Sequence, residues 1–266
     1  MHKSSCDAKT VDRSYVQCVS ICEKGLVRDS NEDSIAIAHG DEHGVPAKGM
    51  LLIVADGMGG MAQGERASRY VTAELPSLYF SASNTNPVEA LVNAVHEVNG
   101  HLYRMGNRTS ADQMMGTTLV AVVVLGECVI TVNVGDSRAY LLQEERLLQL
   151  SSDHTVRRRF YHPFRKHADT LTHILTQAIG PQPSVTPHIS VHRASPHELI
   201  LLCSDGLSAV LSDAEIERTL RTASFEDALP RLKEEVYRRG GDDNLSVVLS
   251  RRVKEGVSLQ QQSVTE

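Results

Sequence analysis

The sequence predicts an α+β protein in which antiparallel sheets are covered by helices. Apolar segments of strand length follow one another in groups, and segments with helical periodicity occur in pairs between these groups. Of the 266 residues, 41% are hydrophobic, which is enough for a core, and only 4% are aromatic, so we expect an aliphatic core. The simplest organisation is a single domain spanning residues 14–253, with polar tails at 1–13 and 254–266.

The N-terminal elements are defined by their periodicity. Tyr15–Ile21 and Ser34–His39 alternate apolar and polar residues, as half-buried strands do, whereas Met50–Ala55 is a continuous apolar run typical of a fully buried strand. Ala62–Leu75 and Pro87–Tyr103 then carry apolar residues at helical spacing. Pro87 suits the first turn of its helix, because the missing N–H would have no intrahelical partner there.

The central part of the chain returns to strand patterns. Three strands are predicted in succession at 118–126, 127–135 and 137–143. Gly126-Glu127 and Gly135-Asp136 separate them, and both dipeptides are expected to form hairpin turns. The segment 151–173 has no clean period.

The C-terminal third alternates strand and helix. Leu199–Cys203 and Leu245–Leu249 are apolar runs of strand length, and Glu226–Arg239 has helical periodicity. Ser212 precedes Glu215 by three residues, the spacing of a capping box that begins a further helix.

Composition excludes several classes of protein. A net charge of −6 argues against nucleic acid as the main partner, since binding phosphates requires clustered Lys and Arg. Five cysteines without a CxxC pair favour neither a disulfide framework nor a zinc site. No apolar run reaches the length of about 18–20 residues that a membrane span needs, and the polar N-terminus lacks a signal-peptide core, so a cytoplasmic location is expected.

Acidic residues occur at the ends of predicted strands. Asp56, Asp136 and Asp205 follow strands, Asp243 precedes the last strand, and the pair Glu32–Asp33 precedes another. Any one of them fits ordinary turn chemistry, because Asp-Gly is a common turn dipeptide. Five such sites indicate carboxylates gathered at one edge of a sheet, where they repel unless a cation lies between them. Oxygen ligands of this kind favour Mg²⁺ or Mn²⁺.

Six segments occur in the order of the motifs of a known family. They are Arg28–Ser34 (RDSNEDS), Val54–Gly60 (VADGMGG), Gly116–Thr118 (GTT), Val134–Tyr140 (VGDSRAY), Ser204–Leu207 (SDGL) and Gly240–Asn244 (GGDDN). On these motifs the chain resembles the protein phosphatase 2C family of metal-dependent Ser/Thr phosphatases, especially its stand-alone bacterial members. The resemblance implies a four-layer α-β-β-α sandwich with a two-metal centre at one edge.

The resemblance also implies roles for individual residues. Asp56 matches the carboxylate that bridges two metal ions, and Gly57 would contribute its carbonyl oxygen to one of them. Asp205 and Asp243 match ligands of the other ion, and Asp136 with Asp205 matches a weaker third site. Glu32 and Asp33 match carboxylates that act largely through bound water. Two ions can activate a shared water for in-line attack on phosphorus.

Two further residues concern the phosphate and the leaving group. Arg28 matches the phosphate-binding arginine, whose planar guanidinium pairs with two phosphate oxygens at once; by itself it would read as a surface arginine. Some family members carry His in the third place of the Asp-Gly-x-Gly-Gly motif, where this chain has Met58, which cannot donate a proton. His154 is a candidate proton donor, with a structural or exposed histidine as the alternative.

The segment 154–173 corresponds to the variable flap of the family. It carries five basic residues against one aspartate, a local charge of +4. A cationic flap that includes Arg157, Arg158 and Arg159 would attract phosphopeptides, and a solvated loop is the alternative.

The functional hypothesis is a Mn²⁺- or Mg²⁺-dependent Ser/Thr phosphoprotein phosphatase. Its expected partner is a phosphoserine or phosphothreonine protein, in opposition to a Ser/Thr kinase, as the resemblance implies; neither nucleic acid nor a membrane is expected. One alternative is a catalytically weak phosphoprotein-binding module of the same fold. A metal-dependent phosphodiesterase or nuclease is another, disfavoured by the acidic chain.

Overall fold

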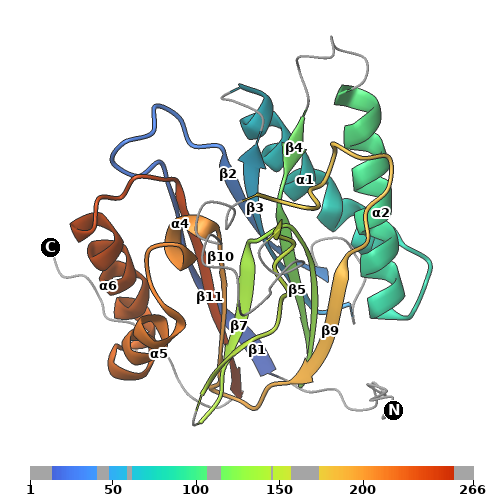
Figure 1. Ribbon diagram of the computed structural model, residues 1–266. Coiled ribbons are helices and arrows are strands. Elements are labelled where there is room, and N and C mark those ends of the chain that lie inside the picture. Colours follow the sequence, from blue (N-terminus) through green and yellow to red (C-terminus); the bar gives the residue numbers. More distant parts are fainter. Residues whose placement is uncertain are drawn as a thin grey trace, which may run out of the picture.

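Two antiparallel sheets packed face to face form the centre of the molecule in the computed structural model (Figure 1). The structure describes residues 14–40, 48–58, 62–106, 115–144, 146–156 and 174–254. The expected tails and most of the expected flap therefore lie outside the described residues, although Lys254 still belongs to the last strand.

One sheet has five strands in the order β1-β11-β10-β7-β8. Their bounds are β1 (Ser14–Glu23), β7 (Arg138–Leu142), β8 (Leu147–Gln149), β10 (Leu199–Cys203) and β11 (Leu245–Lys254). The other sheet has the order β2-β3-β5-β6-β9, with β4 paired to β3. Its strands are β2 (Asp33–His39), β3 (Met50–Met58), β4 (Gly116–Thr117), β5 (Leu119–Leu125), β6 (Cys128–Val134) and β9 (His188–Arg193).

Helices cover the outer face of each sheet. The long helices α1 (Ala62–Ser81) and α2 (Pro87–Gly106) lie on the six-stranded sheet. The helices α5 (Asp213–Thr222) and α6 (Phe225–Arg238) lie on the five-stranded sheet (Figure 1). This is the predicted four-layer α-β-β-α sandwich.

The alternation of side chains along each strand produces three apolar layers. In β3, Leu51 and Ile53 face the helices α1 and α2, whereas Leu52 and Val54 face the other sheet. Because both faces are buried, this antiparallel strand is a continuous apolar run rather than an alternating one. The inner layer is aliphatic throughout, as the scarcity of aromatic residues predicts.

Several local expectations are confirmed. Gly126 lies in the β5–β6 turn with φ of +55°, and the N–H of Ser212 donates to Glu215 Oε2 at 2.9 Å in the capping box that begins α5. The hairpin expected at Gly135-Asp136 is wrong, because β6 and β7 belong to different sheets. The dipeptide instead carries the chain from one sheet to the other.

Strand ends also differ from the expectation at the functional edge. β3 continues to Met58, because Gly57 pairs with Thr117 of β4, and β2 begins at Asp33. Asp56 therefore lies within a strand and not after one. The sequence pattern also gave no sign of β8, β9 or the four-residue helix α4 (Asp205–Ser208).

No helix in the described part of the chain is long and apolar enough to cross a membrane.

Candidate metal centre

Two of the predicted carboxylates face each other across neighbouring strands. Asp33 of β2 and Asp56 of β3 are direct partners in the antiparallel register. Asp33 is 4% exposed; its Oδ2 accepts a hydrogen bond from Ser204 Oγ at 2.8 Å, whereas its Oδ1 is buried without a hydrogen-bond partner. Burial raises the pKa of Asp33 to about 7, and the charges of Asp205 and Asp243 add to the effect. A buried carboxylate oxygen without a partner is suited to a cation or a cation-bound water.

The backbone of Asp56 is held by the Gly-Thr-Thr segment. The N–H of Asp56 donates to Thr118 Oγ1 at 3.0 Å, and its carbonyl accepts from the N–H of Thr118 and from Thr117 Oγ1, both at 2.8 Å. Burial raises the pKa of Asp56 well above its ordinary range, with further contributions from Asp33, Asp205 and other nearby carboxylates. The two threonines thus fix the position of Asp56, although the surroundings of its carboxyl group disfavour the charged form.

Close packing of three chain segments makes glycine necessary beside Asp56. The N–H of Gly57 donates to the carbonyl of Glu32 at 3.1 Å, and a Cβ at Gly57 would overlap the carbonyl oxygen of Gly64 in the first turn of α1. A Cβ at Gly64 would overlap Oε2 of Glu32. These glycines bring Glu32, the end of β3 and the start of α1 together. Sequence reasoning missed Gly64, because it lies outside the motifs.

Asp205 and Asp243 lie at the same edge of the five-stranded sheet, where α4 packs against the turn before β11. A Cβ at Gly206 would overlap the carbonyl oxygen of Asn244, so only glycine allows this approach. Asp243 is partly buried, whereas the adjacent Asp242 is exposed. Asp205 in turn contributes to the raised pKa values of Asp33, Asp56 and Asp136.

Asn244 connects the two loops at this edge, a role that sequence reasoning missed. Its Nδ2 donates to the carbonyls of Lys24 and Ser30, both at 2.9 Å, and its Oδ1 accepts from the N–H of Glu32 at 2.8 Å. One amide side chain therefore fixes the segment that carries Arg28 and Glu32 against the segment that carries Asp243.

Arg28 lies at this edge beside Asp243. Its Nη2 donates to Asp243 Oδ2 at 2.8 Å, while 54% of the Arg28 side chain stays exposed. The ion pair directs the guanidinium toward the carboxylate edge and leaves part of its surface open to an incoming anion.

Asp136 and His154 lie together at the connection between the sheets. Gly135 adopts a φ of +105°, and its N–H donates to His154 Nδ1 at 3.3 Å. That bond leaves the His154 ring proton on Nε2. Burial raises the pKa of Asp136 to about 7, with contributions from Asp205 and Asp153. These contacts give His154 a structural task, the support of the turn that carries Asp136.

The segment that leads to the expected flap is anchored by an ion pair. Arg138 Nε donates to both carboxylate oxygens of Asp153 at 3.1 Å, and its Nη2 donates to Oδ2 at 2.6 Å. Arg157, Arg158 and Arg159 themselves lie outside the described residues. The hypothesis of a cationic flap therefore stays a prediction from the sequence.

The carboxylate edge suits hard cations in its chemistry. All of its donors are oxygens, one buried oxygen has no partner, and the pKa values of three carboxyl groups are raised by burial and further by the neighbouring carboxylates. Among the described residues, no three acidic, histidine or cysteine side chains already lie close enough to form a complete ligand set. The fold thus gathers the donors at one edge without closing them into a finished cage.

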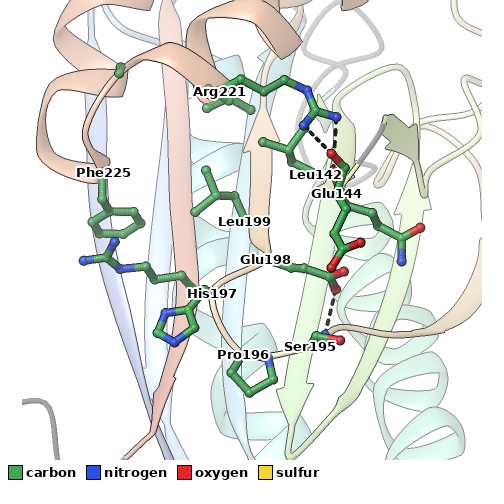
Figure 2. Close-up of a pocket in the computed structure, with 13 residues that line it drawn as sticks. Leu142, Glu144, Ser195, Pro196, His197, Glu198, Leu199, Arg221 and Phe225 are labelled. Atoms are coloured by element: carbon green, nitrogen blue, oxygen red, sulfur yellow. Dashed lines mark hydrogen bonds between the residues drawn. The ribbon is translucent and has the colours of Figure 1, made fainter.

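A separate groove lies at the opposite end of the five-stranded sheet. It has a volume of about 480 Å³ and is lined by Leu142 at the end of β7, Leu199 at the start of β10 and Arg251 near the end of β11 (Figure 2). Asp205 and Asp243 flank the other ends of β10 and β11, so the groove is separated from the carboxylate edge by the length of the strands.

Comparison with known proteins agrees with this geometry. The family model described as Protein phosphatase 2C matches residues 28–250. The chain is 33% identical over 233 residues to the serine/threonine protein phosphatase PstP of Mycobacterium tuberculosis, covering 86% of this chain but only 43% of PstP. It is 31% identical over 242 residues to the serine/threonine phosphatase stp of Listeria innocua, covering 86% of this chain and 93% of the relative.

A solved structure extends the comparison to three dimensions. The catalytic domain of PstP in complex with two manganese ions superposes with a TM-score of 0.77 at 33% identity, covering 91% of this chain and all of the other. The fold, the order of the motifs and the family model agree, and the chain belongs to the protein phosphatase 2C family.

Proposed function

We propose that this chain is a Mn²⁺- or Mg²⁺-dependent serine/threonine phosphoprotein phosphatase that hydrolyses phosphomonoesters by in-line attack of water. The observation that carries the proposal is the pairing of Arg28 with Asp243 at the edge where Asp33, Asp56 and Asp136 have raised pKa values. A half-exposed guanidinium beside several carboxylates that can bind cations is suited to a phosphate that the arginine and the cations bind together.

The chain supplies the ligands for two ions and for a weaker third. Asp56 and the carbonyl of Gly57 would hold one ion, Asp56 with Asp205 and Asp243 the other, and Asp136 with Asp205 the third. Glu32 and Asp33 would orient bound water. When bound, such ions supply an activated water nucleophile and neutralise charge on the phosphate.

Arg28 has the role of binding and orienting the phosphoryl group. Its planar guanidinium presents several N–H groups in a fixed plane, which a lysine ammonium does not. The bond from Nη2 to Asp243 holds this plane beside the metal ligands, so that the phosphate is placed for in-line attack.

His154 remains our candidate for protonating the leaving alkoxide, because Met58 cannot. To protonate the alkoxide from Nε2, His154 would first have to become the imidazolium, so Nδ1 would take up a proton and give up its bond from the Gly135 N–H. In a His154→Gln variant we expect the rate to lose its acidic-to-neutral pH dependence, measured as kcat against pH. A uniform fall at every pH would assign His154 to support of the Asp136 turn alone.

The test of the function is phosphate release from a phosphothreonine peptide with Mn²⁺ and then with EDTA. We expect release with Mn²⁺ and none with EDTA. Binding is measured separately: Mn²⁺ at a hundredfold excess over its dissociation constant should stabilise the protein by about 2.7 kcal/mol, seen as a rise in Tm. Stabilisation without phosphate release would favour the phosphoprotein-binding module.

The physiological substrate we propose is a phosphoprotein produced by a Ser/Thr kinase. The relatives are named as serine/threonine phosphatases, which supports this substrate class. Activity on a phosphodiester but not on phosphothreonine would favour a phosphodiesterase instead.

A further inference from the structure

We propose that Leu26 and Val27 form a docking surface for an apolar side chain of the phosphoprotein, two or three residues from the phosphorylated one. This inference rests on the proposed function, because it uses Arg28 as the phosphate-binding group. It adds a substrate preference that neither the motifs nor the comparisons supply.

Leu26 and Val27 are the most exposed of the large hydrophobic side chains in the described part of the chain. They are 59% and 63% exposed, whereas Ile37, Ile174 and Ile189 are 40–49% exposed. Isolated exposed apolar residues are ordinary on protein surfaces. These two are consecutive, and they directly precede Arg28.

The loop that carries them is held rigidly, so their exposure is built into the fold. The N–H of Leu26 donates to the carbonyl of Gly241 at 2.8 Å. Gly25 adopts a φ of +78°, and a Cβ there would overlap the carbonyl of Asp243. Asn244 also bonds to the carbonyls of Lys24 and Ser30, on either side of the pair. Both ends of the loop are therefore fixed to the turn that carries Asp243.

A second surface continues the apolar character of the pair. A Cβ at Gly241 would lie 3.1 Å from both Leu26 Cγ and Tyr237 Cδ1, so glycine leaves room for Leu26 beside the Tyr237 ring. The Leu26–Val27 pair thus extends toward the end of α6 on one side and toward Arg28 on the other.

The spacing fits a peptide whose phosphate is bound by Arg28. An extended chain advances about 3.3–3.6 Å per residue, so a side chain two or three positions away lies roughly 7–10 Å from the phosphorylated residue. An extended Arg28 side chain, lying between Val27 and the bound phosphate, spans a similar distance. Burying an apolar side chain on a rigid surface costs little conformational entropy in the protein.

The experiment compares two phosphothreonine peptides in the presence of Mn²⁺. One has Leu at positions two and three on both sides of the phosphothreonine, and the other has Ser at those positions. We expect wild type to favour the Leu peptide about tenfold in kcat/KM, the discrimination typical of a modest apolar contact. In the Leu26→Ser/Val27→Ser double variant we expect the two peptides to be hydrolysed alike.

Matched controls separate docking from loop damage. Ile189→Ser removes an apolar side chain that is 42% exposed on β9 and should leave the tenfold preference intact. Leu26→Met/Val27→Ile should retain the preference, because it conserves apolar surface. A fall in the double variant that is equal for the Leu peptide, the Ser peptide and a small aryl phosphate would overturn the proposal, since the loop would then act only as support.

Failure of this inference is distinguishable from failure of the proposed function. Wild-type hydrolysis of both peptides at equal kcat/KM overturns the docking surface and leaves the phosphatase standing. Mn²⁺-loaded wild type that hydrolyses neither peptide nor the aryl phosphate overturns both.

Discussion

The two ends of the five-stranded sheet arrange their charged residues in opposite ways. At the groove end, Arg221 donates to Glu217 Oε1 at 2.8 Å. It also donates to the carbonyl of Glu144 at 2.6 Å (Figure 2). Arg251 there lies 4.3 Å from the centre of the Phe225 ring. At the other end, Asp33, Asp56 and Asp136 are held near one another, and their pKa values rise.

The difference favours the carboxylate end as the place of the proposed chemistry. Charges at the groove end are satisfied by partners within the fold, which is what stability alone requires. Charges of one sign at the carboxylate end are disfavoured in the isolated chain and become favourable when cations bind. In this protein, the groove in the surface is therefore a poorer guide to function than a group of carboxylates whose charged forms the fold disfavours.

The largest expected effect comes from removing the central carboxylate. Asp56→Asn should lower kcat by roughly 10²–10³-fold, the loss typical of removing one group that stabilises transition-state charge. The same variant should raise the Tm of the metal-free protein, because a neutral amide replaces a buried carboxyl group whose charged form the fold disfavours. Phosphate release and thermal unfolding in EDTA measure the two effects. A variant with lower Tm in EDTA would contradict the proposal that the fold disfavours the charged form of Asp56.

The next effect concerns Arg28, the proposed phosphate-binding group. Arg28→Lys keeps the charge but loses the planar fork, so we expect kcat/KM to fall roughly 10- to 100-fold, in keeping with about 1.5–3 kcal/mol for a charged hydrogen bond. Mn²⁺ affinity, measured by calorimetry, should change little. An Arg28→Lys enzyme with wild-type kcat/KM would remove Arg28 from the phosphate site.

The metal-free protein should lose stability as the pH rises. Asp33 and Asp136 have pKa values of about 7 in the fold against an ordinary 3.8, so the native state keeps protons that the unfolded chain has released. Their contribution is fully present below about pH 4 and is lost as the pH rises through 7. Unfolding in EDTA should therefore give a higher Tm at about pH 5.5 than at about pH 8.

Carboxylates that form ion pairs elsewhere in the protein do not affect the comparison of Tm at pH 5.5 and pH 8. Arg239 and Ser212 lower the pKa of Glu215 to about 2, so its contribution to stability is lost only in more acidic solution. Asp33→Asn should reduce the difference in Tm between the two pH values. A Tm that rises from pH 5.5 to pH 8 in EDTA would exclude raised carboxyl pKa values in the native state.

The smallest effect is expected at the groove. Arg221→Ala removes a partly exposed ion pair and two bonds to loop carbonyls, so the free energy of unfolding should fall by about 1 kcal/mol or less. Chemical denaturation measures this change, and kcat with Mn²⁺ should match wild type. A large fall in kcat would show that the two ends are coupled.

Local pattern determined most of the fold. Long apolar runs such as β3, β5 and β6 were predictable, because strands buried on both faces exclude polar residues over several positions. The edge strand β9 was missed, since His188, Ser190 and His192 interrupt its apolar positions. The four-residue α4 has too little local signal to be predicted.

The motif residues could likewise be identified from the sequence, but the residues that hold them in position could not. Arg28, Asp56, Asp136, Asp205 and Asp243 all reach the predicted edge, as their order in the six motifs indicates. Ser204, Asn244 and Gly64 were not singled out, although they hold Asp33, the Arg28 loop and Glu32 in place.

The sequence by itself determined the long buried strands, the aliphatic core and the carboxylates that a cation would need. Only the tertiary structure decided that Gly135-Asp136 joins two sheets, that Asn244 fixes the loop of Leu26 and that Asp33 faces Asp56. Periodicity records which side of a strand is buried, whereas the pairing of strands and the contacts between distant residues depend on register and close packing, which leave no local pattern.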